Sequence, residues 1–547
     1  MNMRKLARPR PSRLVLAALL AAALFSPARA EHAEVWSDWI TSLKSQGYVV
    51  TQGASVQHSC DALVAVFKTC FGNNPAGLYA DIELPIDNEY VDPCYNAAHD
   101  CSGSTPNLFT STAVLPDGSQ ASVNPFYRLG ESDALVLVIK LPPKAAYFGT
   151  QSYVYSRARS LYSQKCRPAP SYQAPNPCRM QTRASVGAAV NDVVIANQFH
   201  PRHGRGGTIA VVTTPNQALF AALGEAFAGV GGDRDRLFAE PLGATIGAGA
   251  QAAGVVTGLG AGSDELNTLV RYTLPQDAAA ATRWQNAVGD NIQVFRVRRP
   301  GLPAAPYNVT LAAKSYATDE SVYKDALNEL ANSLQGWLAT VNGANVSRGL
   351  VTVSATYSAT GEPQAGYIGT VCLNAETDCL RDTQDTDAYR FGYILKLQNT
   401  ALFIGVESAY TGNATYTTVG MFRGDVFEGV ASLAQTNPAV TGFDSGTLGG
   451  SAADLIASLV AAGSIPPPSP ALAKALPNLY VAIVTRACAT PDAPSAPFFC
   501  AKGYTVNIDS TLVPLAVPVL VGQRAYMLPG DTRGANPHFL ATPILLN

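Results

Sequence analysis

Residues 133–157 read DALVLVIKLPPKAAYFGTQSYVYSR, and this stretch sets the expectation for the fold. Its first part, 133–142, is almost continuously apolar, which is typical of a strand that is covered on both faces. Residues 147–157 instead alternate between two kinds of side chain, which is the period of a β-strand. Two strand signals in succession indicate a fold that is rich in β-sheet.

Further strand signals lie in the second half of the chain. Residues 349–358, 389–397, 401–410 and 414–422 read as successive antiparallel strands. The last two are joined by the sequence Thr-Gly-Asn at 411–413, which is typical of a hairpin turn. We therefore expect these two strands to be neighbours in one sheet.

Helical signals are fewer, and two of them lie between residues 208 and 298. A strand at 208–212 runs into a helix for which Thr214 is the expected N-cap and Pro215 the first helical residue. Residues 267–297 read strand, helix, strand. Together these segments resemble a split β-α-β unit.

Three other segments stand out by composition. Residues 318–341 form an amphipathic pattern that begins with Thr318 and an acidic first turn, which predicts a helix. Residues 242–262 are rich in glycine and alanine and carry no charge, so we interpret them as a buried or flexible connection. Residues 464–477 are rich in proline and predict a semi-rigid spacer, after which the chain returns to the main body.

Taken together, the pattern predicts an α+β fold that is predominantly antiparallel and sandwich-like, with a split β-α-β unit and a few amphipathic helices. The chain divides into a signal peptide at 1–30, an N-terminal β-rich region at 31–206, the split β-α-β unit at 207–300, a second β-rich region at 301–463, the spacer at 464–477, and a C-terminal segment at 478–547 that packs back on the body.

The first thirty residues have the three parts of an export signal. Residues 1–13 are basic, residues 14–25 are apolar, and the sequence Ser-Pro-Ala-Arg-Ala at 26–30 ends in small residues that suit signal peptidase. The apolar run is too short to span a bilayer comfortably. We expect a mature chain that begins near Glu31 and is secreted or periplasmic, without a transmembrane segment.

Charge excludes one class of partner. The chain has 38 Lys and Arg residues against 40 Asp and Glu residues, and six of the basic residues lie in the expected signal, so the mature chain would carry a net charge of −8. Nucleic-acid binding depends on a basic surface, and no Lys or Arg block is present. We expect no nucleic acid as partner, and small-molecule or polymer ligands stay open.

The ten cysteines come in five close couples, which predicts disulfides in an exported chain. The zinc alternative lacks the usual Cys-x-x-Cys spacing. The expected local bridges are Cys60–Cys70, Cys94–Cys101, Cys166–Cys178, Cys372–Cys379 and Cys488–Cys500.

Common catalytic and cofactor signatures are absent from the sequence. There is no Gly-x-Ser-x-Gly, no His-Glu-x-x-His, no Walker loop and no complete Gly-x-Gly-x-x-Gly, so we expect no cofactor. His200 and His203 lie in a turn-like segment between arginines, which we interpret as a solvated loop rather than a metal or anion site. The acidic run around Asp378 has the oxygen-rich character of a calcium loop without EF-hand spacing, and we interpret it too as solvated. Its other members are Asp382, Asp385 and Asp387.

The strand at 147–157 carries the strongest site candidate. Its alternation places aromatic and cationic side chains on one face, where they suit a polar ligand. These side chains belong to Tyr147, Gln151, Tyr153, Tyr155, Arg157 and, just beyond the strand, Arg159.

Glu407 is the second candidate, because a carboxylate in the apolar run 401–410 must either pair with an arginine or have a raised pKa. The simplest interpretation is a structural Arg157–Glu407 pair or an exposed strand face without a ligand. Two functions remain open: a hydrolase with Glu407, Arg157 and Tyr155 as catalytic groups, or a non-catalytic protein that holds a ligand at Tyr147 and Tyr153. A cleft with paired buried carboxylates would favour the enzyme, and an exposed Tyr/Arg face would favour binding.

Overall fold

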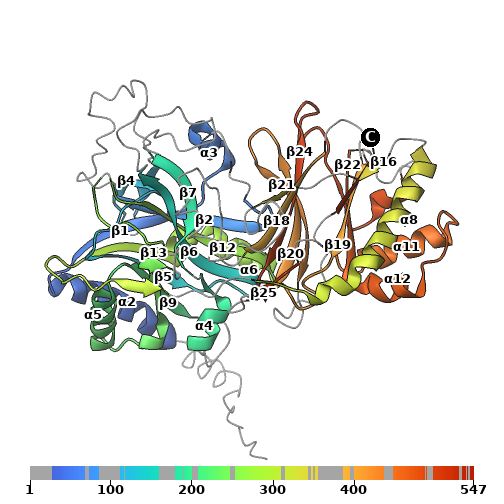
Figure 1. Ribbon diagram of the computed structural model, residues 1–547. Coiled ribbons are helices and arrows are strands. Elements are labelled where there is room, and N and C mark those ends of the chain that lie inside the picture. The colour runs from blue at the N-terminus through green and yellow to red at the C-terminus, as the bar shows by residue number, and fades with distance from the viewer. Residues whose placement is uncertain are drawn as a thin grey trace, which may run out of the picture.

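The structure is a computed structural model (Figure 1). It describes residues 27–67, 70, 73–85, 111–115, 118–158, 179–187, 189–199, 207–246, 253–260, 262–309, 315–342, 346–348, 352–354, 386–394, 400–436, 447–486, 488, 497–528, 533–536, 539 and 542–546.

A curled sheet of twelve strands forms the N-terminal half of the molecule (Figure 1). Its main path runs β10-β9-β5-β13-β1-β2-β12-β6-β7, and all neighbours on this path are antiparallel except β9 and β10. The strands are β1 Val49–Val56, β2 Gly77–Pro85, β3 Ser111–Val114, β4 Gln120–Asn124, β5 Asp133–Lys140, β6 Ala145–Ala158, β7 Arg179–Ser185, β8 Val190–Asn191, β9 Thr208–Thr214, β10 Leu237–Pro241, β12 Glu265–Pro275 and β13 Ile292–Arg298.

Helices α2 and α5 cover the outer face of this sheet. Trp36 and Trp39 from α2 contact Phe227 of α5, and these rings bury the outer face of the strands. The inner face forms a second core around Phe148, Tyr272 and other apolar side chains. The helices of this half are α2 Pro27–Ser45, α3 Cys60–Phe67, α4 Asp192–Gln198, α5 Gln217–Gly229, α6 Ala278–Asn286 and α7 Val288–Asn291, with the 3₁₀ turn η2 Arg234–Arg236.

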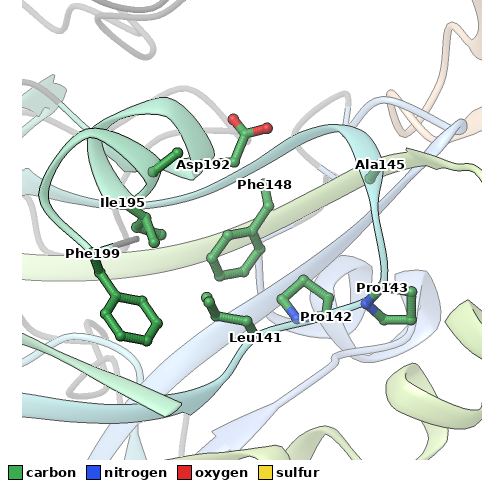
Figure 2. A pocket seen from close by; sticks show the side chains of 9 residues that line it. Leu141, Pro142, Pro143, Ala145, Phe148, Asp192, Ile195 and Phe199 are labelled. Atoms are coloured by element: carbon green, nitrogen blue, oxygen red, sulfur yellow. The ribbon is translucent and has the colours of Figure 1, made fainter. Parts of the chain in front are cut away.

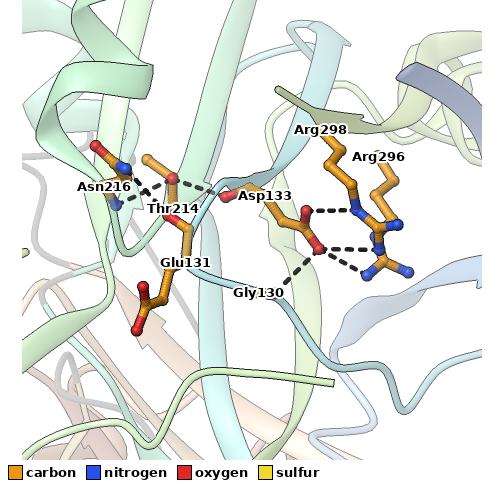
Figure 3. A network of polar contacts seen from close by, with 7 residues as sticks. All are labelled: Gly130, Glu131, Asp133, Thr214, Asn216, Arg296 and Arg298. Carbon is orange, nitrogen blue, oxygen red and sulfur yellow. Dashed lines mark hydrogen bonds and ion pairs between the residues drawn. The ribbon is translucent and has the colours of Figure 1, made fainter. Parts of the chain in front are cut away.

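Asp133, at the start of β5, ties three neighbouring strands together (Figure 3). Its buried carboxylate accepts hydrogen bonds from Arg296 at 2.7 Å and Arg298 at 2.8 Å, both on β13. Its backbone carbonyl accepts the Thr214 hydroxyl of β9 at 2.8 Å. Burial alone would raise the pKa of Asp133, but the hydrogen bonds and charges of the two arginines hold that pKa below its usual value.

Two five-stranded sheets packed face to face form the C-terminal half, with helices against the outer one (Figure 1). One sheet has the order β16-β26-β19-β22-β23 and the other β17-β18-β24-β20-β21. The strands are β16 Val346–Arg348, β17 Thr352–Ser354, β18 Thr386–Ile394, β19 Thr400–Val406, β20 Tyr416–Arg423, β21 Gly429–Thr436, β22 Leu479–Thr485, β23 Thr505–Asn507, β24 Val519–Tyr526 and β26 Thr542–Leu546.

The remaining elements of this half are short or helical. Two small parallel pairs join β11 to β14 and β15 to β25. Residues 464–477 include helix α12, whose capping residue Ser469 donates its hydroxyl to Glu329 of α8 at 2.7 Å. The elements are β11 Gly243–Ile246, β14 Tyr307–Val309, β15 Ser315–Tyr316, β25 Arg533–Gly534, α8 Lys324–Asn342, α11 Ser451–Ala461 and α12 Pro470–Ala475, with 3₁₀ turns η4 Asp319–Tyr323, η5 Leu476–Asn478 and η6 Phe498–Ala501.

The predicted α+β, mainly antiparallel fold is confirmed. Residues 208–298 do run strand, helix, strand twice, but β9 and β10 are adjacent parallel strands, and β1 and β2 lie between β12 and β13. The predicted start of the first helix in this stretch is wrong. Asn216, not Thr214, caps α5, because its side chain accepts the backbone N–H groups of Ala218 and Leu219. The Thr214 hydroxyl is already engaged with the Asp133 carbonyl (Figure 3).

The predicted hairpin between the strands around 401–410 and 414–422 is also wrong. β19 ends at Val406, β20 begins at Tyr416, and the two strands belong to different sheets. Gly412 has the positive φ of 81° that a tight turn needs, but the residues on either side of it form successive turns, with backbone hydrogen bonds back to Glu407 and Ser408. These turns carry the chain across the sandwich, so the segment is a crossover.

The Cys60–Cys70 and Cys488–Cys500 disulfides are confirmed, with Cα atoms 5.3 Å and 5.6 Å apart. Cys94, Cys101, Cys166, Cys178, Cys372 and Cys379 lie outside the described residues, as does the expected signal up to residue 26. Across the helices that the structure describes, none is long and apolar enough to cross a membrane.

Tyrosine rings join the two halves. Tyr147 of β6 lies against Tyr526 of β24, with ring centroids 5.1 Å apart, and Tyr526 stacks on Tyr416 of β20 at 4.4 Å. All three side chains are buried. The end of β6 nearest Ala145 is therefore a contact between the halves.

Candidate functional site

The strand face that carries the predicted ligand site is buried along most of its length. Tyr147 packs at the junction of the halves, and the Tyr153 ring lies under the Arg271 guanidinium, 5.4 Å from its central carbon. Tyr155 stacks on Phe126 with centroids 3.8 Å apart. The three tyrosines therefore contact three different partners, which are Tyr526, Arg271 and Phe126.

Arg157 lies near the far end of β6 and is paired with Asp264. Its Nε and one terminal nitrogen donate to the two carboxylate oxygens at 2.9 Å and 2.7 Å, and that terminal nitrogen also donates to the Gly254 carbonyl at 2.6 Å. Asp264 in turn accepts the Val256 backbone N–H. This bidentate arrangement attaches Gly254, Val256 and Asp264 to the end of β6.

The predicted Arg157–Glu407 pair is therefore wrong. A strand rises about 3.3 Å per residue, so Tyr147 and Arg157 are roughly 33 Å apart along β6. Tyr147 faces the C-terminal half, whereas Arg157 binds the loop before β12. One small ligand cannot contact both ends of this face. Arg159 lies outside the described residues.

Glu407 sits at the corner where the chain leaves β19, and its side chain is buried. One carboxylate oxygen, Oε1, accepts the Thr417 hydroxyl and, at 3.4 Å, the Ala409 N–H. Its other oxygen, Oε2, has no hydrogen-bond partner among the described residues. Burial, together with the nearby negative charge of Glu320, raises the pKa of Glu407 to about 8.

Glu320 is a buried neighbour that the sequence did not single out. Its oxygens accept the Asn536 backbone N–H at 2.6 Å, the Thr411 hydroxyl at 2.8 Å and the Asn413 amide at 3.3 Å. Burial raises its pKa as well. Its only sequence signal was the acidic first turn after Thr318, which was interpreted as helix capping. In the structure the Thr318 side chain makes no capping hydrogen bond.

Glu240 is another buried carboxylate that the sequence analysis missed. It lies inside the curled sheet and accepts the Ser152 N–H at 2.5 Å, the Ser152 hydroxyl at 2.6 Å and the Thr213 hydroxyl at 2.5 Å. The Ser152 hydroxyl also lies 2.6 Å from the Thr268 hydroxyl, which contacts Tyr127. Burial raises the pKa of Glu240. This enclosed network joins β6, β9, β10 and β12.

A small pocket opens between the turn after β5 and helix α4 (Figure 2). Its volume is about 60 Å³. Phe148, Ile195 and Phe199 point into the same space as the ring of Pro142, and the Asp192 carboxylate is the charged group among the lining side chains (Figure 2). The other lining residues are Leu141, Pro143, Ala145 and Ala196.

Other sequence candidates lie largely outside the described residues. This holds for His200 and His203 and for Asp378, Asp382 and Asp385, whereas Asp387 falls within β18. Among the side chains that the structure describes, no group of three or more His, Cys, Asp or Glu residues converges as metal ligands would.

Comparisons with known proteins do not assign a family. No protein-family description and no curated protein matches the chain. A putative uncharacterized protein from Burkholderia cenocepacia is similar over 91% of this chain and 82% of its own, with 9% identity and a TM-score of 0.32. The partial N-terminal region of an enterococcal surface protein is similar over 88% and 83%, with 8% identity and a TM-score of 0.12. Scores this low carry no argument about function.

Proposed function

We propose that this chain is an exported, non-catalytic binding protein that recognises one apolar group of its ligand in the pocket beside α4. The pocket is the observation on which this proposal depends. Its walls are aromatic, aliphatic and proline side chains from two elements, β6 and α4, with their flanking loops. Pockets of this composition favour apolar ligands because binding removes carbon surface from water on both partners.

The size of the pocket limits what enters it. A dry cavity of about 150 Å³ accommodates benzene in another protein, so about 60 Å³ accepts only part of a larger ligand. A branched alkyl group or the edge of an aromatic ring is of suitable size. The remainder of the ligand would lie outside, over the partly exposed residues of α4.

The separation of the predicted catalytic residues favours binding over hydrolysis. A hydrolase built from Glu407, Arg157 and Tyr155 requires these groups in one cleft. Arg157 is held by Asp264 and Tyr155 by Phe126, while Glu407 lies in the other half of the molecule. Export is supported by the two disulfides, since such bonds persist mainly in oxidising compartments.

The pocket can be blocked without disturbing the core. Ala196 is exposed and lines the pocket, whereas its neighbour Asn197 is exposed and does not. Ala196→Trp should place a ring over the opening, and Asn197→Trp is the matched control. Binding of benzene and isobutane-like fragments, measured by saturation-transfer NMR, should fall at least about 10-fold in Ala196→Trp and stay unchanged in the control.

Two results would contradict the proposal. One is equal fragment binding by both tryptophan variants, which would place the bound fragments elsewhere. The other is no fragment binding by the unmodified protein. Recovery of the mature protein in the cytoplasm with reduced cysteines would contradict export independently of the pocket.

A further inference from the structure

The Phe199 ring forms one wall of the pocket beside α4, and residues outside the pocket contact it. Phe199 follows the last residue of α4, and its side chain is 8% exposed. Its backbone N–H donates to the Ile195 carbonyl at 2.8 Å, so the two side chains lie one helical turn apart and face the space that Pro142 borders (Figure 2). The width of the pocket therefore depends on how firmly this ring is held.

Two residues that do not line the pocket contact the Phe199 ring. The central guanidinium carbon of Arg236, in η2, lies over the ring at 5.0 Å from its centroid, which is a cation–π arrangement. A Cβ atom on Gly207 would lie only 3.0 Å from the ring atom Cε1, so the ring packs directly against the backbone at this glycine. The Leu141 N–H donates to the Gly207 carbonyl at 2.9 Å, which attaches that backbone to another wall of the pocket.

Both ends of α4 are also attached to strands. Gln198 donates its side-chain amide to the carbonyl groups of Leu237 at 2.8 Å and Asp235 at 3.2 Å. These two residues flank Arg236, so η2 and the end of α4 are held together. At the other end the Asn191 side chain caps α4, and Asn191 pairs with β6. A helix of seven residues has little stability of its own, so these contacts determine its position.

We propose that Arg236 limits the size of the apolar group that the pocket accepts, because it holds the Phe199 ring in place. The guanidinium contacts the ring and not the ligand, so Arg236 is a positioning residue. With the ring held, about 60 Å³ admits a branched alkyl group or the edge of a single aromatic ring, and a fused pair of rings is excluded. This inference rests on the proposed function, since it concerns the same pocket.

Arg236→Ala should release the ring without removing any atom that lines the pocket. The substitution leaves space beside the Phe199 ring and removes the cation–π contact, so the ring can turn away from Phe148 and Pro142. The pocket then becomes wider. A group that was too large should gain more affinity than a small one.

Two aromatic fragments of different size, benzene and naphthalene, test the inference in saturation-transfer NMR titrations. Transfer from water favours naphthalene, which has the larger apolar surface, so a preference for benzene reports a limit on size. The unmodified protein should bind benzene at least about 10-fold more tightly than naphthalene. Arg236→Ala should shift the ratio of the two dissociation constants at least about 10-fold toward naphthalene.

Arg234→Ala is the matched control. Arg234 lies in the same 3₁₀ turn, but its side chain is 53% exposed and pairs with Glu225 of α5. This variant should leave the ratio of the two dissociation constants unchanged. A general loss of stability would weaken the binding of both fragments alike, so the ratio separates positioning of the ring from a purely structural role of Arg236.

Phe199→Leu is a second variant, and it leaves η2 intact. It removes the ring itself and should shift the ratio toward naphthalene as Arg236→Ala does. Adding Arg236→Ala to Phe199→Leu should cause no further shift, because the ring through which Arg236 acts is then absent. A further shift in the double variant would mean that Arg236 acts by another route, and the inference would be wrong.

The remaining outcomes distinguish the inference from the proposed function. If benzene binds and Ala196→Trp blocks it, but Arg236→Ala and Arg234→Ala give the same ratio, the pocket binds apolar groups and Arg236 does not limit their size. That result overturns the inference alone. If neither fragment binds to the unmodified protein, the proposed function fails and the inference fails with it.

Discussion

Glu240 in the N-terminal half and Glu407 in the C-terminal half are both buried carboxyl groups, and they differ in how they are hydrogen-bonded. Both oxygens of Glu240 accept hydrogen bonds, from Ser152 and Thr213. Among the residues that the structure describes, Glu407 has donors at Oε1 only. The pKa of each is raised by burial, so burial alone does not separate them. The carboxyl with both oxygens hydrogen-bonded joins strands, whereas Glu407 keeps one oxygen without a donor among the described residues.

The largest expected effect is on stability, from removal of the two carboxyl groups. Glu240→Leu leaves three buried donors without an acceptor and should destabilise the fold by about 3–5 kcal/mol. Glu407→Leu leaves two donors without an acceptor and removes an unpartnered oxygen, so a loss of about 1–2 kcal/mol is expected. Urea unfolding of both variants measures the difference. Equal losses would mean that hydrogen bonding does not distinguish the two sites.

A smaller loss of stability is expected at the Arg157–Asp264 pair. It differs from the two glutamates because the buried carboxylate is compensated by an opposite charge. Arg157→Ala should destabilise by about 2–3 kcal/mol, since Asp264 would remain buried without its cation. The double variant Arg157→Ala, Asp264→Ala should lose less than the sum of the single losses. The same cycle with Glu407 in place of Asp264 should show additive losses. Coupling between Arg157 and Glu407 would contradict the structure.

The smallest effect is a dependence on pH from Asp133. Its pKa is lower in the folded protein than in the unfolded chain, so it stabilises the fold above the unfolded value of about 3.9. This contribution disappears as the pH falls through the folded pKa. Unfolding free energies of the unmodified protein and Asp133→Asn, measured from about pH 5.5 to 2.5, should converge toward low pH. A constant gap would show that the carboxylate charge is not involved.

Local sequence patterns predicted many of the strands and the two disulfides that the structure describes, because both depend on neighbours in the chain. The period of two in β6 was visible from residues 147–157 alone. The partner of Arg157 was not, since Asp264 is 107 positions away and nothing local selects it. Glu320 was hidden for the same reason, as its donors come from residues 411–413 and 536.

Two local predictions, the N-cap of α5 and the hairpin at Gly412, were wrong. In each case the local sequence suits two structures equally well, and contacts with distant residues determine which one forms. Thr214 and Asn216 are both favourable N-caps, and the Asp133 carbonyl engages the threonine hydroxyl. The turn at Gly412 suits a hairpin as well as a crossover. β19 and β20 pair with different strands and lie in different layers of the sandwich. The sequence of a turn alone does not show whether the next strand stays in the same sheet or crosses to the other one.

The position of β26 has a consequence for the order of synthesis. Residues 542–546 pair with β19 on one side and β16 on the other, so this late segment completes the middle of its sheet. Because the chain is synthesised from its N-terminus, one edge of β19 has no partner strand until residue 546 has been made. An open strand edge is a site for pairing with other chains. During synthesis, this sheet is therefore open to pairing with other chains for longer than the twelve-stranded sheet of the N-terminal half, whose strands are all available by residue 298.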